Sequence, residues 1–290
     1  MMMMRAKRQF PVLLLVFFLI TVPVEARGQS IRVSGSSTVM PLAEISAEEF
    51  NILQNDYRVI VDSGGSGVGI VNVVEGRSAI AMTSRELHLV ERQRYETPKK
   101  RFNVTTVGYD AICLIVSREV YNSGVTNLTK EEVRRIYSGS ISNWKELGGP
   151  DRGIFAIGRK PGSGTRDTFD EIIMGSRESE TPGVRYEAAE SAEIKTAIQK
   201  SDNAIGYVGY SYIMRGDSNV ISLDGVPPSI ENIKNGSYPL SREFYFITLG
   251  RPSQGAQAFI DFVLSAEGQR IAIENGFIPA FLQIPPLEAL

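Results

Sequence analysis

The fold is decided by three stretches that share one pattern: IRVSGSST at residues 31–38, VIVDSGGSG at 59–67 and IFAIGRKPGSGT at 154–165. Each begins with a short apolar run typical of a buried strand and passes into a turn rich in serine and glycine. A helix is predicted after each turn, because apolar residues then recur at helical spacing, as they do from Val39 to Phe50. Strands that alternate with helices predict an α/β fold with largely parallel sheets.

The rest of the chain continues this alternation. Further strands are predicted at Ala79 to Met82, Val104 to Val107, Ile112 to Val116, Ala204 to Val208 and Phe244 to Leu249. Further helices are predicted at Lys130 to Tyr137, Ala188 to Lys200 and Gln254 to Leu264. We find no repeat of fixed period, which excludes a solenoid.

Composition excludes several classes of protein. The chain has 290 residues, 42% of them hydrophobic, with a net charge of −2, one cysteine and one histidine. This apolar fraction is too high for a disordered chain, and the charge lacks the basic excess of a nucleic-acid binder. A single cysteine cannot form an internal disulfide, so Cys113, which lies in an apolar run, is expected to be a small buried hydrophobe. The length suggests about two domains.

The N-terminal segment has the pattern of a signal peptide. Arg5, Lys7 and Arg8 precede an apolar stretch from Phe10 to Val22, which is short for a membrane-spanning helix. We expect cleavage after Ala26, with an uncleaved membrane anchor as the alternative. No cysteine stands at the end of the apolar stretch, so a lipoprotein anchor is not expected. The expected location is therefore the periplasm or the outer face of the cytoplasmic membrane.

The three Ser/Gly turns favour the binding of an anion. A helix N-terminus has unpaired backbone N–H groups and a partial positive charge, glycine allows close approach, and serine or threonine adds a hydroxyl donor. One turn alone is more typical of ordinary helix capping. Three turns, one of them with Arg159 four residues before Ser163, could together bind a small anion in a cleft between two lobes.

Rival motifs are absent from the sequence. Gly158 to Thr165 lacks the Gly-Lys-Ser/Thr order of a P-loop, and Gly65 to Gly69 is one residue too short for a dinucleotide fingerprint. No serine has the flanking glycines of a nucleophile elbow. With His88 as the only histidine and Cys113 in an apolar strand, neither a hydrolytic triad nor a metal centre is expected. We therefore expect no catalytic residue, no metal and no cofactor.

The chain resembles the phosphate-binding proteins of the phosphate ABC transporter in their shorter form, from about Ile31 to the C-terminus. The matching pieces are Ser34 to Val39 with Pro41-Leu42, Gly64 to Gly69, Thr83 to Leu87, Ser138 to Lys145, Arg159 to Phe169, Ala204 to Gly209 and Asn235 to Leu240.

The resemblance implies a two-lobed type II periplasmic-binding-protein fold, in which each lobe is a mixed sheet flanked by helices and the chain crosses twice between the lobes. One lobe would comprise residues 28–108 and 245–290, and the other residues 109–244, with a hinge near Tyr109 and Phe244. The residues implied to bind phosphate are Ser37, Thr38, Ser66, Ser84, Arg85, Arg159, Ser163, Gly164 and Thr165.

The sequence departs from the family at its acidic position. Many members have an acidic residue shortly before Gly-Ser-Gly-Thr that accepts the proton of hydrogen phosphate, whereas Lys160 and Pro161 stand here. Asp62 or Glu86 could supply the acceptor instead. Because such an acceptor rejects sulfate, which has no proton to offer, sulfate is less firmly excluded than in other members. Arg166 could equally form a surface ion pair or belong to the site.

The function implied is capture of inorganic phosphate between two lobes by an exported, monomeric protein that delivers it to a membrane-embedded ABC permease, with no nucleic-acid partner. Three alternatives stay open: a binder of sulfate or another tetrahedral oxyanion, a phosphoesterase that uses the same pocket, and a sensory or adhesive phosphate binder without a permease.

Overall fold

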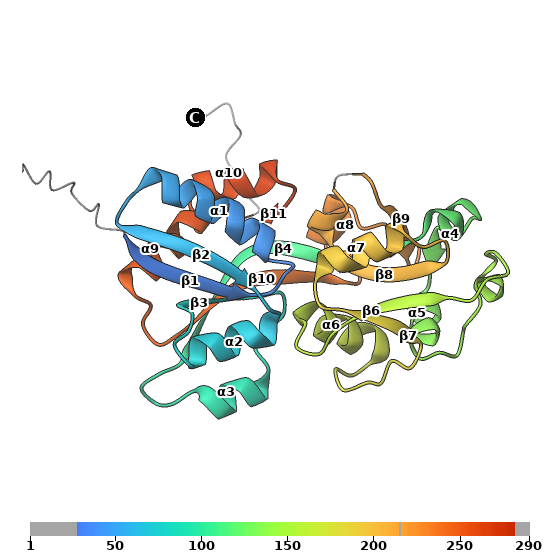
Figure 1. Cartoon of the computed structure of the whole chain (residues 1–290), viewed down its shortest axis with the longest axis horizontal. Coiled ribbons are helices and arrows are strands. Elements are labelled where there is room, and N and C mark those ends of the chain that lie inside the picture. The colour runs from blue at the N-terminus through green and yellow to red at the C-terminus, as the bar shows by residue number, and fades with distance from the viewer. Residues whose placement is uncertain (1–27, 215, 282–290) are drawn as a thin grey trace, which may run out of the picture.

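Two lobes lie side by side and are joined by two long strands, β4 (Phe102–Val116) and β10 (Ser241–Leu249) (Figure 1). The computed structural model describes residues 28–214 and 216–281. The predicted signal peptide, residues 1–26, lies outside the described residues. Within the part that is described, no helix is both long and apolar enough to cross a membrane.

The first lobe is a sheet covered by helices on both faces. Its strand order is β2-β1-β3-β10-β4, in which β1 is parallel to β2 and β3 and β10 is antiparallel to both of its neighbours. Its elements are β1 (Gln29–Gly35), β2 (Tyr57–Ser63), β3 (Ile80–Thr83), β11 (Ile278–Pro279), α1 (Met40–Leu53), α2 (Ser66–Val74), α3 (Leu89–Tyr95), α9 (Gln254–Leu264) and α10 (Ala266–Glu274), with the first part of β4.

Two apolar clusters hold these layers together. Phe50 of α1 and Phe259 of α9 pack in one cluster with strand residues such as Val33. Ile70 and Val73 of α2 pack in the other cluster. The serine and threonine residues at the ends of β1 and β3 are therefore fixed by a sheet that is packed on both faces.

The second lobe repeats this design. β6 is parallel to β7 and to β8, while β4 is antiparallel to β8 and β9. Its elements are β5 (Asn127–Leu128), β6 (Phe155–Arg159), β7 (Val184–Ala188), β8 (Ala204–Gly209), β9 (Asn219–Leu223), α4 (Arg118–Asn122), α5 (Lys130–Tyr137), α6 (Gly164–Phe169), α7 (Ser191–Gln199) and α8 (Ile230–Lys234), the 3₁₀ turns Trp144–Leu147 and Tyr210–Tyr212, and a π turn at Asp170–Met174.

An aromatic core fixes the third Ser/Gly turn. Phe169 at the end of α6 stacks on Tyr207 of β8 with ring centroids 4.0 Å apart, and Tyr137 packs against both. The buried thiol of Cys113 lies in the same core, which confirms its expected role as a small hydrophobe. Because α6 is anchored at its far end, the turn at its start is held in place.

The chain crosses between the lobes where β4 and β10 run side by side. Val107 of β4 packs in the core of the first lobe, whereas Ala111 packs in that of the second. The register of β10 shifts between Phe244 and Tyr245, and such a bulge bends a strand locally. This bulge lies at the predicted hinge; the hinge motion and the lobe boundaries stay predictions.

Three expectations about the elements were wrong. The strands predicted at 104–107 and 112–116 are one strand, because Gly108 to Asp110 continue the ladder with β10 although they interrupt the apolar pattern. The helix predicted from Ala188 begins at Ser191, because Val184–Ala188 pairs with β6. The sheets are mixed rather than largely parallel, since both crossover strands run antiparallel to their neighbours.

Candidate functional site

The three Ser/Gly turns converge between the lobes. Gly65 of the second turn donates its backbone N–H to the carbonyl of Gly35, beside the first turn, at 2.8 Å. Gly67 donates to the carbonyl of Gly162 in the third turn at 3.1 Å. Gly65 has φ +95, which only glycine adopts readily. The turns therefore meet through their backbones, and their side chains are brought to one place.

Seven buried hydroxyl groups gather there, and we call them the hydroxyl cluster. Thr38 Oγ1 lies 3.0 Å from Thr165 Oγ1 and 3.1 Å from Ser191 Oγ. Ser36 Oγ donates to Ser84 Oγ at 3.0 Å. Every member is 3% exposed or less. The cluster consists of Ser36, Ser37, Thr38, Ser66, Ser84, Thr165 and Ser191.

Gly164 allows this close approach. A Cβ atom at this position would lie 2.2 Å from Ser66 Oγ and 3.0 Å from Ser84 Oγ. Any larger residue would therefore push the third turn away from the first lobe. Beside it, Ser163 is the N-cap of α6 and accepts a hydrogen bond from the backbone N–H of Arg166 at 3.3 Å.

Arg159, the last residue of β6, contacts the hydroxyl cluster. Its Nη1 donates to Ser191 Oγ at 2.9 Å and its Nη2 donates to Ser37 Oγ at 3.1 Å. Its other donors reach the carbonyls of Ala188 and Ala189. The side chain is 2% exposed, and no carboxylate of the described residues lies within ion-pair distance of it.

A buried positive charge without a countercharge is unfavourable, and burial lowers the pKa of Arg159 accordingly. Neutral hydroxyl and carbonyl oxygens surround this guanidinium. The surroundings of Arg159 are therefore suited to a small anion, which would supply the missing negative charge.

A second buried arginine also reaches the cluster. Arg242 of β10 donates from Nη1 to Thr165 Oγ1 at 2.9 Å, and it pairs with Asp110 of β4 at 2.7 Å. Burial raises the pKa of Asp110, while the charge of Arg242 opposes this rise. The sequence reasoning missed this pair. A detectable signal was the lone carboxylate of Asp110 between two apolar runs.

Ser191 was also missed. It is the first residue of α7, and its hydroxyl lies between Arg159 and Thr38. A serine at a helix start resembles the capping residues that were recognised in the three turns. It passed unnoticed because the helix was predicted to begin at Ala188.

Arg85 and its neighbours lie beside the hydroxyl cluster. The Arg85 guanidinium pairs with Glu91 at 2.8 Å and with Asp167 at 2.7 Å. His88 Nε2 lies 3.5 Å from the same Asp167 carboxylate. Two carboxylates thus offset the charge of Arg85.

Seven of the nine predicted site residues lie together at the hydroxyl cluster: Ser37, Thr38, Ser66, Ser84, Arg159, Gly164 and Thr165.

The three residues whose roles the sequence left open lie outside the cluster. The Asp62 side chain is 49% exposed and lies 3.7 Å from Arg32, and Glu86 is exposed. Arg166 pairs with Glu187 at 2.6 Å and with Asp170 at 3.3 Å, and it donates to the backbone carbonyl of Arg159. Arg166 therefore supports the strand that carries Arg159.

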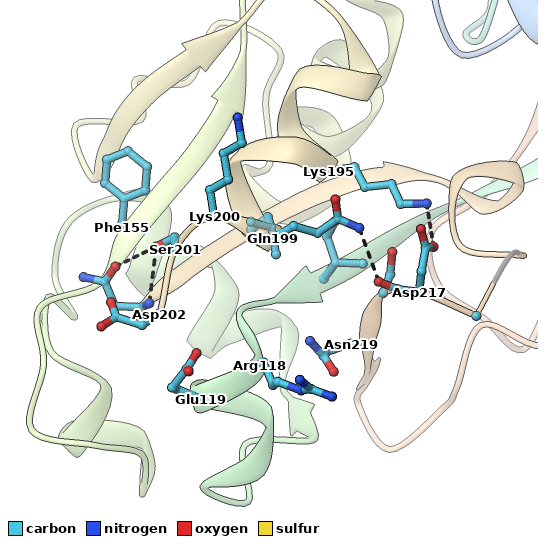
Figure 2. A pocket seen from close by; sticks show the side chains of 15 residues that line it. Arg118, Glu119, Phe155, Lys195, Gln199, Lys200, Ser201, Asp202, Asp217 and Asn219 are labelled. Atoms are coloured by element: carbon cyan, nitrogen blue, oxygen red, sulfur yellow. Dashed lines mark hydrogen bonds and ion pairs between the residues drawn. The ribbon is translucent and has the colours of Figure 1, made fainter.

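A large open hollow lies elsewhere, on the second lobe beside α7 (Figure 2). It measures about 890 Å³ and contains no member of the hydroxyl cluster. Lys195 pairs there with Asp217 at 2.6 Å. Both signs of charge line this hollow, so it lacks the unbalanced positive charge that surrounds Arg159.

A family model described as a PBP superfamily domain matches residues 21–267. The phosphate-binding protein PstS of Bacillus subtilis is 32% identical over 257 residues, which cover 88% of this chain and 82% of that protein. PstS of Borreliella burgdorferi is 29% identical, over 86% of this chain and 89% of that protein.

Solved structures agree with the fold. A Clostridium perfringens structure, described as a phosphate ABC transporter substrate-binding protein with bound phosphate, is 36% identical with a TM-score of 0.79, covering 87% of this chain and all of that one. An ABC-type phosphate transport receptor from Vibrio cholerae is 28% identical with a TM-score of 0.70, covering 86% of this chain and 99% of that one. The predicted two-lobed α/β fold of type II periplasmic binding proteins is confirmed.

Proposed function

Since this chain belongs to the PBP superfamily and, within it, to the family of PstS phosphate-binding proteins, we propose that it captures inorganic phosphate between its lobes and delivers it to an ABC permease. The observation that carries this proposal is the buried charge of Arg159, whose hydrogen bonds all go to neutral oxygens. Phosphate would supply the countercharge and would also accept hydrogen bonds from the hydroxyl cluster.

The free energies of hydrogen bonding and association favour a site made from several turns. A hydrogen bond to a charged group contributes about 1.5 to 3 kcal/mol, association costs about 4 to 15 kcal/mol, and micromolar affinity needs about 8 kcal/mol net. One turn with three such bonds would not suffice. Hydroxyl groups from both lobes, together with Arg159, could supply the larger total.

The residues that would contact phosphate come from both lobes, so binding is expected to close the lobes. Ser37 and Thr38 belong to the first lobe, whereas Arg159, Thr165 and Ser191 belong to the second. Phosphate can touch both sets only when the lobes are together, so its binding shifts the population toward the closed form. Arg85 and Ser163, which are also predicted to bind phosphate, flank these contacts.

We further propose that the protein acts outside the cytoplasm as a monomer, after cleavage of the N-terminal segment. Its relatives are named as binding and transport proteins, which supports binding rather than catalysis. Sulfate stays the rival ligand, because Asp62 and Glu86 are too exposed to accept the proton of a buried phosphate.

Calorimetry on the chain from residue 27 onward tests this proposal, with phosphate and sulfate titrated separately. We expect measurable phosphate binding and weaker sulfate binding. If sulfate binds as tightly as phosphate or more tightly, phosphate is not the specific ligand of the site. If phosphate does not bind, the proposal is overturned. Turnover of a chromogenic phosphate ester would favour the enzyme alternative instead.

A further inference from the structure

Asp110 and Arg242 face each other on the two strands that cross between the lobes. Their Cα atoms are register partners in the β4·β10 ladder, although 132 residues separate them in the chain. Both side chains are nearly inaccessible, at 2% and 4% exposed. An ion pair at this place is unusual in one respect: one of its partners also reaches the hydroxyl cluster of the proposed site.

The guanidinium of Arg242 divides its donors between two neighbours. Nε and Nη2 both donate to Asp110 Oδ2, at 2.9 and 2.7 Å. Nη1 donates to Thr165 Oγ1 at 2.9 Å. A guanidinium has five N–H donors, so three are used in these bonds. The second N–H of Nη1 takes part in none of these bonds, and it is on the nitrogen that already contacts Thr165 of the cluster.

The carboxylate of Asp110 is occupied by protein donors. Its Oδ2 accepts both bonds from Arg242, and its Oδ1 accepts the backbone N–H of Tyr210 at 2.8 Å. A carboxylate held in this way fixes the plane of the guanidinium opposite it. Its remaining capacity to accept a ligand proton is small, so its part in the site is to orient Arg242.

The two buried arginines stand at opposite ends of one chain of hydroxyl groups. Arg242 contacts Thr165, Thr165 contacts Thr38, Thr38 contacts Ser191, and Ser191 contacts Arg159. We infer that Arg242 is a second arginine that contacts the bound anion, and that Asp110 is the residue that positions it. This inference rests on the proposed function, because it names a further ligand of that same site.

The location of Arg242 links binding to the crossing between the lobes. Arg242 lies on a crossover strand, two residues before the bulge between Phe244 and Tyr245, while Thr165 lies in the second lobe. An anion held by Arg242 therefore contacts the connection between the lobes as well as the two walls of the cleft.

Calorimetry with inorganic phosphate tests the inference on a double variant, D110N together with R242Q. A single R242Q change would leave the Asp110 charge buried without its partner, which strongly destabilises a fold. The double variant removes one charge of each sign, so the net charge of the site is unchanged. We expect it to keep the fold and to bind phosphate at least tenfold more weakly than the wild type.

Two further comparisons separate a positioning role from direct contact with the anion. If Asp110 acts only through Arg242, then the loss from D110N and the loss from R242K are not additive when the two changes are combined. Additive losses would overturn the positioning role. In a T165V background, replacing the Asp110–Arg242 pair still weakens binding if Arg242 touches the anion itself. If the effect disappears there, Arg242 acts only through Thr165.

The matched control is R134Q, which breaks an exposed pair between Arg134 and Glu131, and phosphate affinity should be unchanged. Wild-type protein that fails to bind phosphate would overturn the proposed function. Wild-type protein that binds phosphate, with a folded double variant of equal affinity, would overturn the Arg242 inference alone.

Discussion

Thr38 Oγ1 lies 3.0 Å from Thr165 Oγ1, although 127 residues separate these two threonines in the chain. One hydroxyl belongs to the turn after β1 in the first lobe, and the other to the start of α6 in the second. The contact joins the two walls of the proposed site.

Replacing Arg159 with glutamine should weaken phosphate binding at least tenfold. The change removes the buried positive charge and its donors to Ser37 and Ser191, and one charge-assisted hydrogen bond alone contributes about 1.5 to 3 kcal/mol. Calorimetry measures the affinity, and circular dichroism verifies the fold. Unchanged affinity in a folded variant would place the site elsewhere.

Replacing Gly164 with alanine should weaken phosphate binding without unfolding either lobe. The new Cβ atom would lie 2.2 Å from Ser66 Oγ, so the third turn must move away from the first lobe. We expect at least a tenfold loss, since several contacts depend on that approach. Gly153→Ala is the control, because the atom nearest to its Cβ is at 3.8 Å. Equal affinities of the two variants would contradict the tight approach.

Replacing Asp167 with asparagine should favour the open form. Asp167 of α6 pairs with Arg85 of the first lobe at 2.7 Å, and this pair joins the lobes outside the hydroxyl cluster. We expect a loss of at least about fivefold in binding, because the broken pair is largely buried, although Arg85 keeps its second partner, Glu91. Small-angle scattering of the free protein should show a larger radius of gyration. The exposed pair partner Asp151, changed to asparagine, should alter neither quantity.

Replacing Asp170 with asparagine should change how stability depends on pH. Burial raises the pKa of Asp170 to about 6, and the nearby Arg166 opposes the rise. An unfolded aspartate titrates near 3.9, so between about pH 4 and 6 the native state binds more protons than the unfolded state. The free energy of unfolding contributed by this group therefore falls as pH rises through that window.

Urea unfolding at several pH values measures this effect. The stability difference between wild type and Asp170→Asn should change by roughly 3 kcal/mol between the two ends of the window, in the direction that disfavours the wild type at higher pH. A difference that is independent of pH would show that Asp170 titrates normally.

The three turns could be predicted from the sequence because each is a local pattern of strand, Ser/Gly turn and helix. Arg159 was singled out because it stands directly before one of these turns, and Thr38 and Thr165 because they belong to two of them. The net charge of −2 was no guide, since the positive potential of a site depends on a few buried groups rather than on the total.

Asp110, Ser191 and Arg242 lie outside these local patterns. Asp110 stands alone between two apolar runs, Ser191 follows Glu190, and Arg242 lies between Ser241 and Glu243, so no motif connects them. Only the paired crossover strands and the packing of α7 bring them together. Arg85 was predicted from its position in the sequence to bind phosphate. Its ion-pair partners Glu91 and Asp167 could not be predicted, because the tertiary fold brings them to it. Its role as a phosphate ligand stays a prediction.

A crystal structure of the protein with phosphate tests the central claim most directly. We predict one tetrahedral anion within hydrogen-bond distance of the Arg159 guanidinium and of hydroxyl groups from both lobes, with Thr38 on one side and Thr165 on the other. An anion bound only in the hollow beside α7, or contacts with a single lobe, would contradict the account.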